Sequence, residues 1–210
     1  MMQRVAKILS SDSQMLYHAR VLSASECAEP PKPADYALGQ FVQVKYALEE
    51  ADDEQQTADT EVAVGLIVNS RLLNPEGPYS GPRLTLPHEQ NAVFAPDYLE
   101  DTGVLVSILI VGHVGRRGCH QGIPLQVLPV GSEVLAMASG MLRRFHFDAQ
   151  ERFQLRYFHL LQECGRAFAP ALFSQVQEQL NPLLGVHDQR LLSVLRKNLA
   201  WEASAMWVRS

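Results

Sequence analysis

The spacing of hydrophobic positions changes near residue 132. Before this point, short runs rich in β-branched residues alternate with turns that contain Gly and Pro, which is typical of strands. After it, Gly and Pro become rarer and apolar residues recur at intervals of three and four, which is typical of amphipathic helices. We therefore predict two units, a β-rich unit over residues 1–131 and an α-helical region over residues 132–210.

Several segments of the first unit have the composition of strands, and residues 104–114 are the most apolar and are expected to be central. The predicted strands are residues 4–9, 15–22, 40–46, 61–69, 104–114 and 125–128. Strands this short and numerous are accommodated by a barrel or a sandwich, which protects their edges. We predict an α+β fold: an N-terminal closed β-barrel of about six short, mostly antiparallel strands, followed by a C-terminal helical unit.

The second unit carries signals for helix ends. Ser132 is expected to cap a first helix that runs to about residue 146, and Asp148 to cap a second helix that ends at Gly165. Pro170 fits the first turn of a third helix, and Asp188 fits the start of the last one. The third helix is predicted to bury Leu172, Phe173, Val176 and Leu180, and to end at Asn181 and Pro182.

Composition and charge indicate which partners and which cellular compartment to expect. The formal net charge of −5 disfavours nucleic acid as the default partner, because phosphate binding needs a basic surface. Cys27, Cys119 and Cys164 are far apart and form no CxxC pair, which favours a reducing compartment. No signal peptide is visible, and the longest apolar run, residues 104–111, is too short to span a bilayer. We predict a cytoplasmic protein without a membrane segment.

Four stretches, taken in order, resemble the HAS-barrel, the N-terminal β-barrel of HerA-type DNA-translocating ATPases and of rotary ATP synthase subunits. They are Leu-Gly-Gln-Phe-Val-Gln-Val at 38–44, Val-Gly-Leu-Ile-Val at 64–68, Ile-Leu-Ile-Val-Gly-His-Val at 108–114, and residues 124–134, which include a Pro-x-Gly-x-x-Val pattern. The resemblance covers roughly the first two thirds of the chain. It implies a barrel that serves as a docking platform for partner proteins.

The chain departs from these ATPases after the barrel. The sequence contains no G-x-x-x-x-G-K-[ST] motif, which is the loop that holds the phosphates of ATP in such enzymes. The resemblance therefore does not imply ATP hydrolysis, and we predict no cofactor. Fold alone does not transfer a function.

Arginines provide the main candidate binding site. Arg116 and Arg117 lie in a predicted turn between Gly115 and Gly118, where forked hydrogen bonds and exposed backbone N–H groups can hold a phosphate or carboxylate. The alternative is an ordinary hairpin turn with solvated arginines. Arg143 and Arg144 begin a second basic stretch, which also contains His146, Arg152, Arg156 and the aromatics Phe145, Phe147, Phe153 and Tyr157. This stretch fits either a nucleic-acid groove or an amphipathic helix that buries its aromatics.

Two further groups of residues suggest other chemistry. His113, Cys119 and His120 are soft metal ligands, but a structural zinc site normally has four ligands and the sequence indicates no fourth, so we predict no metal site. Paired acids and histidines between the strands could serve acid–base chemistry only in a pocket that shifts their pKa values. The residues in question are His88, Glu89, Asp97 and Glu100.

Three hypotheses about function follow from these features. The preferred one is a non-enzymatic protein-binding or assembly module whose partner is another protein or a second copy of the chain. The alternatives are an accessory factor in DNA processing that binds nucleic acid through Arg116, Arg117, Arg143 and Arg144, and a metal-assisted enzyme. Trp201 and Trp207 either anchor another subunit or pin the last helix to the barrel, and both interpretations stay open.

Overall fold

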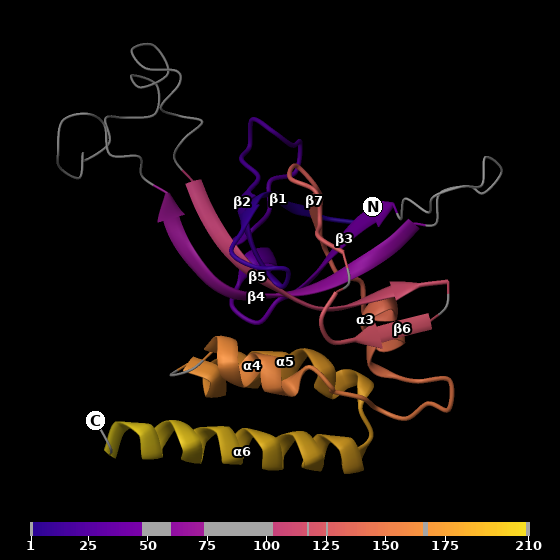
Figure 1. The fold of residues 1–210 in the computed structure, drawn as a ribbon, viewed down its shortest axis with the longest axis vertical. Coiled ribbons are helices and arrows are strands. Elements are labelled where there is room, and N and C mark those ends of the chain that lie inside the picture. Colours follow the sequence, from indigo (N-terminus) through magenta and orange to yellow (C-terminus); the bar gives the residue numbers. More distant parts are fainter. Residues whose placement is uncertain are drawn as a thin grey trace.

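A computed structural model describes residues 2–47, 60–73, 103–116, 118–124, 126–165 and 168–208 (Figure 1). It contains a closed barrel of six antiparallel strands followed by a C-terminal helical region, and this confirms the predicted α+β fold. The helices lie in layers beneath one side of the barrel (Figure 1). No helix in the described ranges is both long and apolar enough to cross a membrane.

The barrel closes through pairings between strands that are distant in sequence. Around its circumference the order is β1, β2, β5, β4, β3 and β7, and β7 pairs again with β1. A seventh strand, β6, pairs only with the end of β5 and forms a hairpin that projects from the barrel. The strands are β1 Arg4–Ser11, β2 Leu16–Val21, β3 Phe41–Ala47, β4 Thr60–Leu73, β5 Gly103–Gly115, β6 Gly118–Gln121 and β7 Glu133–Ala136.

The closing strand of the barrel is the main correction to the sequence prediction. Glu133–Ala136 was assigned to a helix capped by Ser132, but it forms β7, between β1 and β3. Val134 is fully buried in the barrel, and the Ser132 hydroxyl donates a hydrogen bond to the Pro129 carbonyl instead of capping a helix. The barrel thus extends beyond residue 131, the predicted boundary. Four residues are too few for hydrophobic spacing to separate strand from helix.

The predicted strand at residues 125–128 is also wrong over its described part, residues 126–128. Leu128 contributes to the core without joining the sheet, because it is buried and its backbone N–H donates to the Tyr17 hydroxyl at 3.0 Å. A side-chain oxygen here replaces a ladder partner and satisfies the buried N–H group. The other five predicted strands correspond to β1 through β5.

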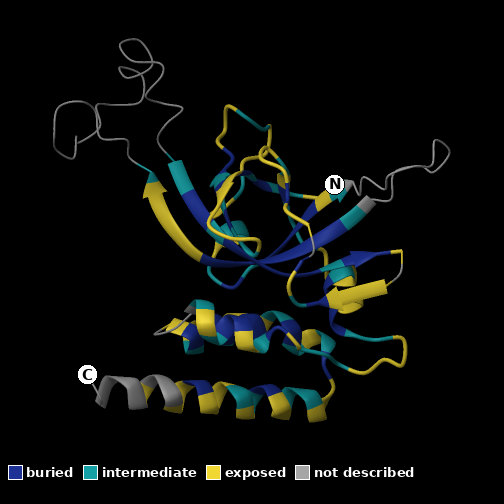
Figure 2. Cartoon of the chain, viewed as in Figure 1, coloured by how far each residue is buried: buried dark blue, intermediate teal, exposed yellow. Residues whose placement is uncertain are grey.

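Both faces of the central strands are buried. One hydrophobic cluster fills the barrel and includes Val44, Ala63, Ile67 and Ile108. A second cluster lies between the barrel and the helices; its members from the strands are Phe41, Val64, Leu66, Val68, Leu109, Val111 and Val114. Figure 2 shows the buried residues of the strands and of the helix layer facing each other. This explains why β4 and β5 have nearly continuous apolar sequences.

Helices α5 and α6 begin close to their predicted signals, whereas α3 and α4 begin later than predicted. They are α3 Ser139–His146, α4 Phe158–Gly165, α5 Ala169–Leu180 and α6 Val186–Val208, with 3-10 turns η1 at Pro33–Tyr36 and η3 at Asn181–Leu183. The four residues predicted to face inward on α5 are all fully buried. The helix predicted from Asp148 begins only at Phe158, because the Asp148 carboxylate accepts hydrogen bonds from the backbone of Gln150 and Arg152 in a turn.

Gly39 sets the contact between the barrel and α5. Its φ of +81° is favourable only for glycine, and a Cβ atom built there would lie 2.5 Å from Cβ of Gln175. The Gln179 amide fixes the same contact, since Nε2 donates to the Gly39 carbonyl at 2.5 Å and Oε1 accepts the Phe41 N–H at 3.4 Å. Because Gly39 has no side chain, α5 can pack directly against the backbone at the start of β3.

Replacing Gly39 with Ala should destabilise the protein. The new methyl group collides with α5 while the backbone keeps an unfavourable left-handed conformation, so we expect a loss of about 2–4 kcal/mol in the free energy of unfolding. Urea denaturation measures this change. Gly140→Ala is the matched control, because nothing lies within 4 Å of its Cβ position on α3, and it should be neutral or slightly stabilising. Equal stabilities for the two variants would contradict the proposed contact.

Candidate functional site

The β5–β6 hairpin carries the arginine turn that the sequence singled out. Gly112 makes the hairpin possible, because its φ is +152° and a Cβ atom there would lie only 2.1 Å from the His120 carbonyl oxygen. The register then places His113 opposite His120 and Gly115 opposite Gly118. The turn lies at the outer end of the hairpin, away from the barrel axis (Figure 1).

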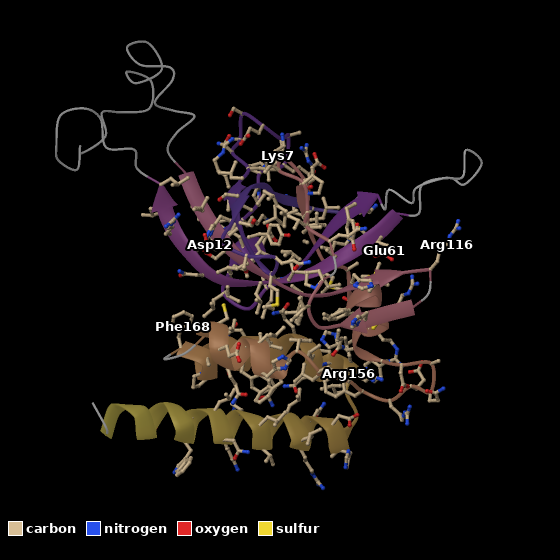
Figure 3. The ribbon with its side chains drawn as sticks, viewed as in Figure 1. Lys7, Asp12, Glu61, Arg116, Arg156 and Phe168 are labelled. Carbon is tan, nitrogen blue, oxygen red and sulfur yellow. The ribbon has the colours of Figure 1, made fainter. Side chains whose placement is uncertain are left out.

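The four predicted arginines do not have a common environment. Arg116 is exposed and extends from the tip of the hairpin (Figure 3), and Arg117 lies outside the described residues. Arg144 reaches from α3 to the same turn and donates to the Gly115 carbonyl at 3.0 Å. Arg143 forms an ion pair with Glu151, and its guanidinium lies 4.7 Å from the centre of the Phe147 ring. The structure therefore joins Arg144 to the turn and directs Arg143 to an acidic partner.

The aromatic residues near these arginines belong to the core. Phe145 and Tyr157 are fully buried between α3 and the segment that precedes α4. A groove for single-stranded nucleic acid needs exposed aromatic faces on which bases stack. The arrangement of these two side chains matches the other interpretation, an amphipathic helix with buried aromatics and exposed arginines.

His146 is fully buried, although the sequence predicts it as part of the basic stretch that begins at Arg143. Its Nδ1 lies 2.8 Å from the Leu142 carbonyl oxygen, and its Nε2 lies 2.7 Å from the Tyr157 hydroxyl. Burial lowers the pKa of His146 to about 4 and raises the pKa of Tyr157 well above its ordinary value. The neutral ring therefore donates from Nδ1 and accepts the phenolic proton at Nε2. Its spacing of four residues from Leu142, which places both on the inner face of the helix, was the available signal.

Gln121 is a second structural residue that the sequence did not reveal. Its buried amide Nε2 donates to the carbonyls of Phe145 at 2.8 Å and Gln154 at 3.1 Å, while Oε1 accepts the Arg156 N–H at 2.8 Å. One side chain thus joins β6 to α3 and to the segment before α4. Nothing in the sequence marks this role, because a lone glutamine at a strand end has no distinctive pattern.

The predicted group of soft ligands separates into two parts. The rings of His113 and His120 lie 5.3 Å apart between centroids, whereas the Cys119 sulfur lies 3.1 Å from the Phe145 carbonyl oxygen, because adjacent residues on β6 point to opposite faces. Among the described residues, no three His, Cys, Asp or Glu side chains form a group that could hold a metal ion.

Glu61 and Tyr46 form a row of polar side chains next to the histidine pair His113 and His120. Glu61 Oε2 accepts a hydrogen bond from the Tyr46 hydroxyl at 2.9 Å and lies 3.9 Å from His113 Nε2. Burial lowers the pKa of His113, and although the Glu61 carboxylate opposes this effect, His120 adds to it. Burial, followed by the hydrogen bond to Glu61, raises the pKa of Tyr46. At neutral pH Tyr46 is therefore a phenol and His113 a neutral imidazole.

A further polar row crosses the seam where β2 meets β5. His18 Nε2 lies 2.8 Å from Asp12 Oδ2, and its Nδ1 lies 3.2 Å from the Ser107 hydroxyl. These are the residue types of a serine-nucleophile triad, but the ring is reversed: in the triad Nε2 faces the serine and Nδ1 faces the acid. His18 and Ser107 are direct cross-strand partners, so we assign the row to closure of the barrel.

Trp201 lies on α6, the helix farthest from the barrel (Figure 1). The residue is 73% exposed, so of the two interpretations left open by the sequence, it does not pin the helix to the barrel. The side chain of Trp207 lies outside the described residues, as do His88, Glu89, Asp97 and Glu100.

The burial of His146 should make stability depend on pH. The unfolded chain takes up a proton on this residue near pH 6.5, but the native protein does so only near pH 4, so the stability is complete above pH 6.5 and decreases as pH falls toward 4. The expected loss is roughly 1.5 kcal/mol between pH 6.5 and pH 5. Urea denaturation at both pH values measures it, and His146→Gln should show a pH dependence smaller by this amount. NMR titration of the His146 ring gives an independent test, and a midpoint above pH 6 would refute the assignment.

Comparison with known proteins identifies the family to which the chain belongs. No curated protein sequence matches the chain significantly. One family described as a domain of unknown function, DUF8166, matches residues 1–208, which include both the barrel and the helices. The chain therefore belongs to the DUF8166 family.

Proposed function

We propose that this protein is a non-enzymatic protein-binding or assembly module. The barrel and helices serve as its scaffold, and the C-terminal helix docks the partner. The closed six-stranded barrel supports the resemblance to the HAS-barrel, whose relatives use this unit as a platform for other proteins. The proposal differs from that resemblance in one respect, because the strongest docking surface lies on α6 rather than on the barrel.

The observation that carries the proposal is the apolar outer face of α6, which we define by Leu191, Val194 and Trp201. These residues are 47%, 54% and 73% exposed, respectively. Their spacing of three and seven residues places them along one side of an α-helix. The opposite side of the same helix is buried through Leu192 and Leu199 in the core shared with α5. Helix α6 is therefore apolar on two faces, and the residues that the structure describes bury one of them in the core.

Burying this face against a partner would release enough free energy to stabilise an interface. Covering an aromatic side chain the size of Trp removes about 150–250 Å² from water, which is worth roughly 4–6 kcal/mol before the cost of association. Trp is also among the residues that dominate binding energies in protein interfaces. A single exposed apolar residue needs no explanation, but three aligned ones on a helix match the pattern with which a helix binds an apolar groove or another helix.

The scaffold is suited to present this helix. The buried core shared by barrel and helices holds α5 in place, and α5 supports α6. The Gln177 amide donates to Ser193 Oγ at 3.2 Å, and the Gln189 amide donates to the carbonyls of Asn181 and Leu184. These bonds fix the start of α6 before any partner binds, so less conformational entropy is lost on association.

The experiment compares the wild type with a Val194→Lys/Trp201→Lys double variant. Sedimentation of the purified protein reports self-association, and purification of a tagged form under native conditions reports binding of other proteins. We expect the double variant to abolish whichever association the wild type shows, because two charges placed in an apolar interface cannot be solvated there. Arg196→Ala, another exposed position on α6, is the matched control and should associate as the wild type does.

Two outcomes would refute the proposal. One is a wild-type protein that remains monomeric and co-purifies with no other protein. The other is a double variant that keeps the wild-type associations while remaining folded by circular dichroism. Dimerisation of the wild type would identify a second copy as the partner, and a monomer that retains a second protein would identify a heterologous one.

A further inference from the structure

His113 and His120 have the geometry of a chelating pair. They are direct partners in the antiparallel β5–β6 hairpin, so their Cβ atoms lie side by side on one face of the sheet. The two rings are 5.3 Å apart between centroids and inclined by 79°. We propose that His113 and His120 bind a late divalent transition-metal ion, of which Zn²⁺ is the representative, with water molecules completing the coordination.

The separation of the rings suits one shared ion. Two imidazole nitrogens bound tetrahedrally to Zn²⁺ at about 2.0–2.1 Å lie roughly 3.4 Å apart. The ring centres must be farther apart than the bound nitrogens, because each nitrogen is at the edge of its ring. A centroid distance of 5.3 Å therefore allows both rings to meet one ion by rotation of the side chains, without movement of the strands.

The surroundings favour a cation at this position. Glu61 Oε2, 3.9 Å from His113 Nε2, adds negative charge beside the pair. The Tyr46 hydroxyl holds this carboxylate at 2.9 Å.

The backbone leaves space for this arrangement. A Cβ atom on Gly115 would lie 2.7 Å from Glu61 Oε1, so glycine at the end of β5 allows the carboxylate to lie beside His113. His120 is exposed and gives an ion access from solvent. Because two imidazoles form the site and the carboxylate stands next to it, the site keeps open positions for water or for a group of a ligand.

The test is a titration of the full-length protein with Zn²⁺ at pH 7.5, measured by competition with a chromophoric chelator. We expect one bound ion per chain, and His120→Ala should weaken binding by about tenfold or more. The matched control is His187→Ala, which removes another exposed imidazole, on α6, and should leave the affinity unchanged. Cys119→Ser should also bind as the wild type does, because the sulfur points to the other face of the hairpin.

Further variants separate loss of a ligand from loss of structure. His120 is exposed, so His120→Ala should unfold at the wild-type urea concentration when no metal is present. Glu61→Gln keeps the hydrogen-bonding size of the side chain, removes its charge, and should weaken Zn²⁺ binding less than His120→Ala. The proposal fails if the wild type binds no Zn²⁺, or if folded His120→Ala binds it with unchanged affinity. This inference does not depend on the docking role of α6.

Discussion

The structure depends on one constraint: the central barrel strands are apolar on both faces and must be covered on both. Ile67 and Ile108 fill the barrel, while Leu66 and Leu109, their sequence neighbours, face the helices. An isolated barrel would expose that second face to water, and isolated helices would lose the surface on which they pack. The barrel and the helical region therefore form one folding unit with two connected cores, and the glycine contact at β3 sets how closely they meet.

The elements that could be predicted are those in which the hydrophobic pattern repeats several times within one continuous segment. The five longest barrel strands and α5 follow from apolar spacing and from Pro170, because each element buries several consecutive repeats. The failures share a different cause. Strand β7 is defined by its partners β1 and β3, so its four residues could not reveal it, and Asp148 supports a turn as readily as a helix start.

In the candidate sites, too, features formed by residues close in sequence could be predicted, and contacts between distant residues could not. The sequence identified the glycine–arginine turn and its histidines, since these residues lie close together in the chain. It could not show that His113 and His120 share a face while Cys119 faces α3, because that depends on the register fixed at Gly112. Nor could it show that Glu61, about fifty residues earlier, lies beside His113. The exposure of Trp201 likewise follows from which face of α6 rests on α5.

The position of β7 has a consequence for how this protein is made. During synthesis the ribosome delivers β1 and β3 long before residues 133–136, yet the facing edges of these two strands are paired through β7. Until that segment emerges, both carry unpaired backbone groups along one side, and such edges recruit strands from other chains. The nascent polypeptide is thus most vulnerable to aggregation over its first 132 residues, and it escapes that state when a four-residue segment inserts between two waiting neighbours. A short, late strand therefore determines when the sheet closes into a barrel.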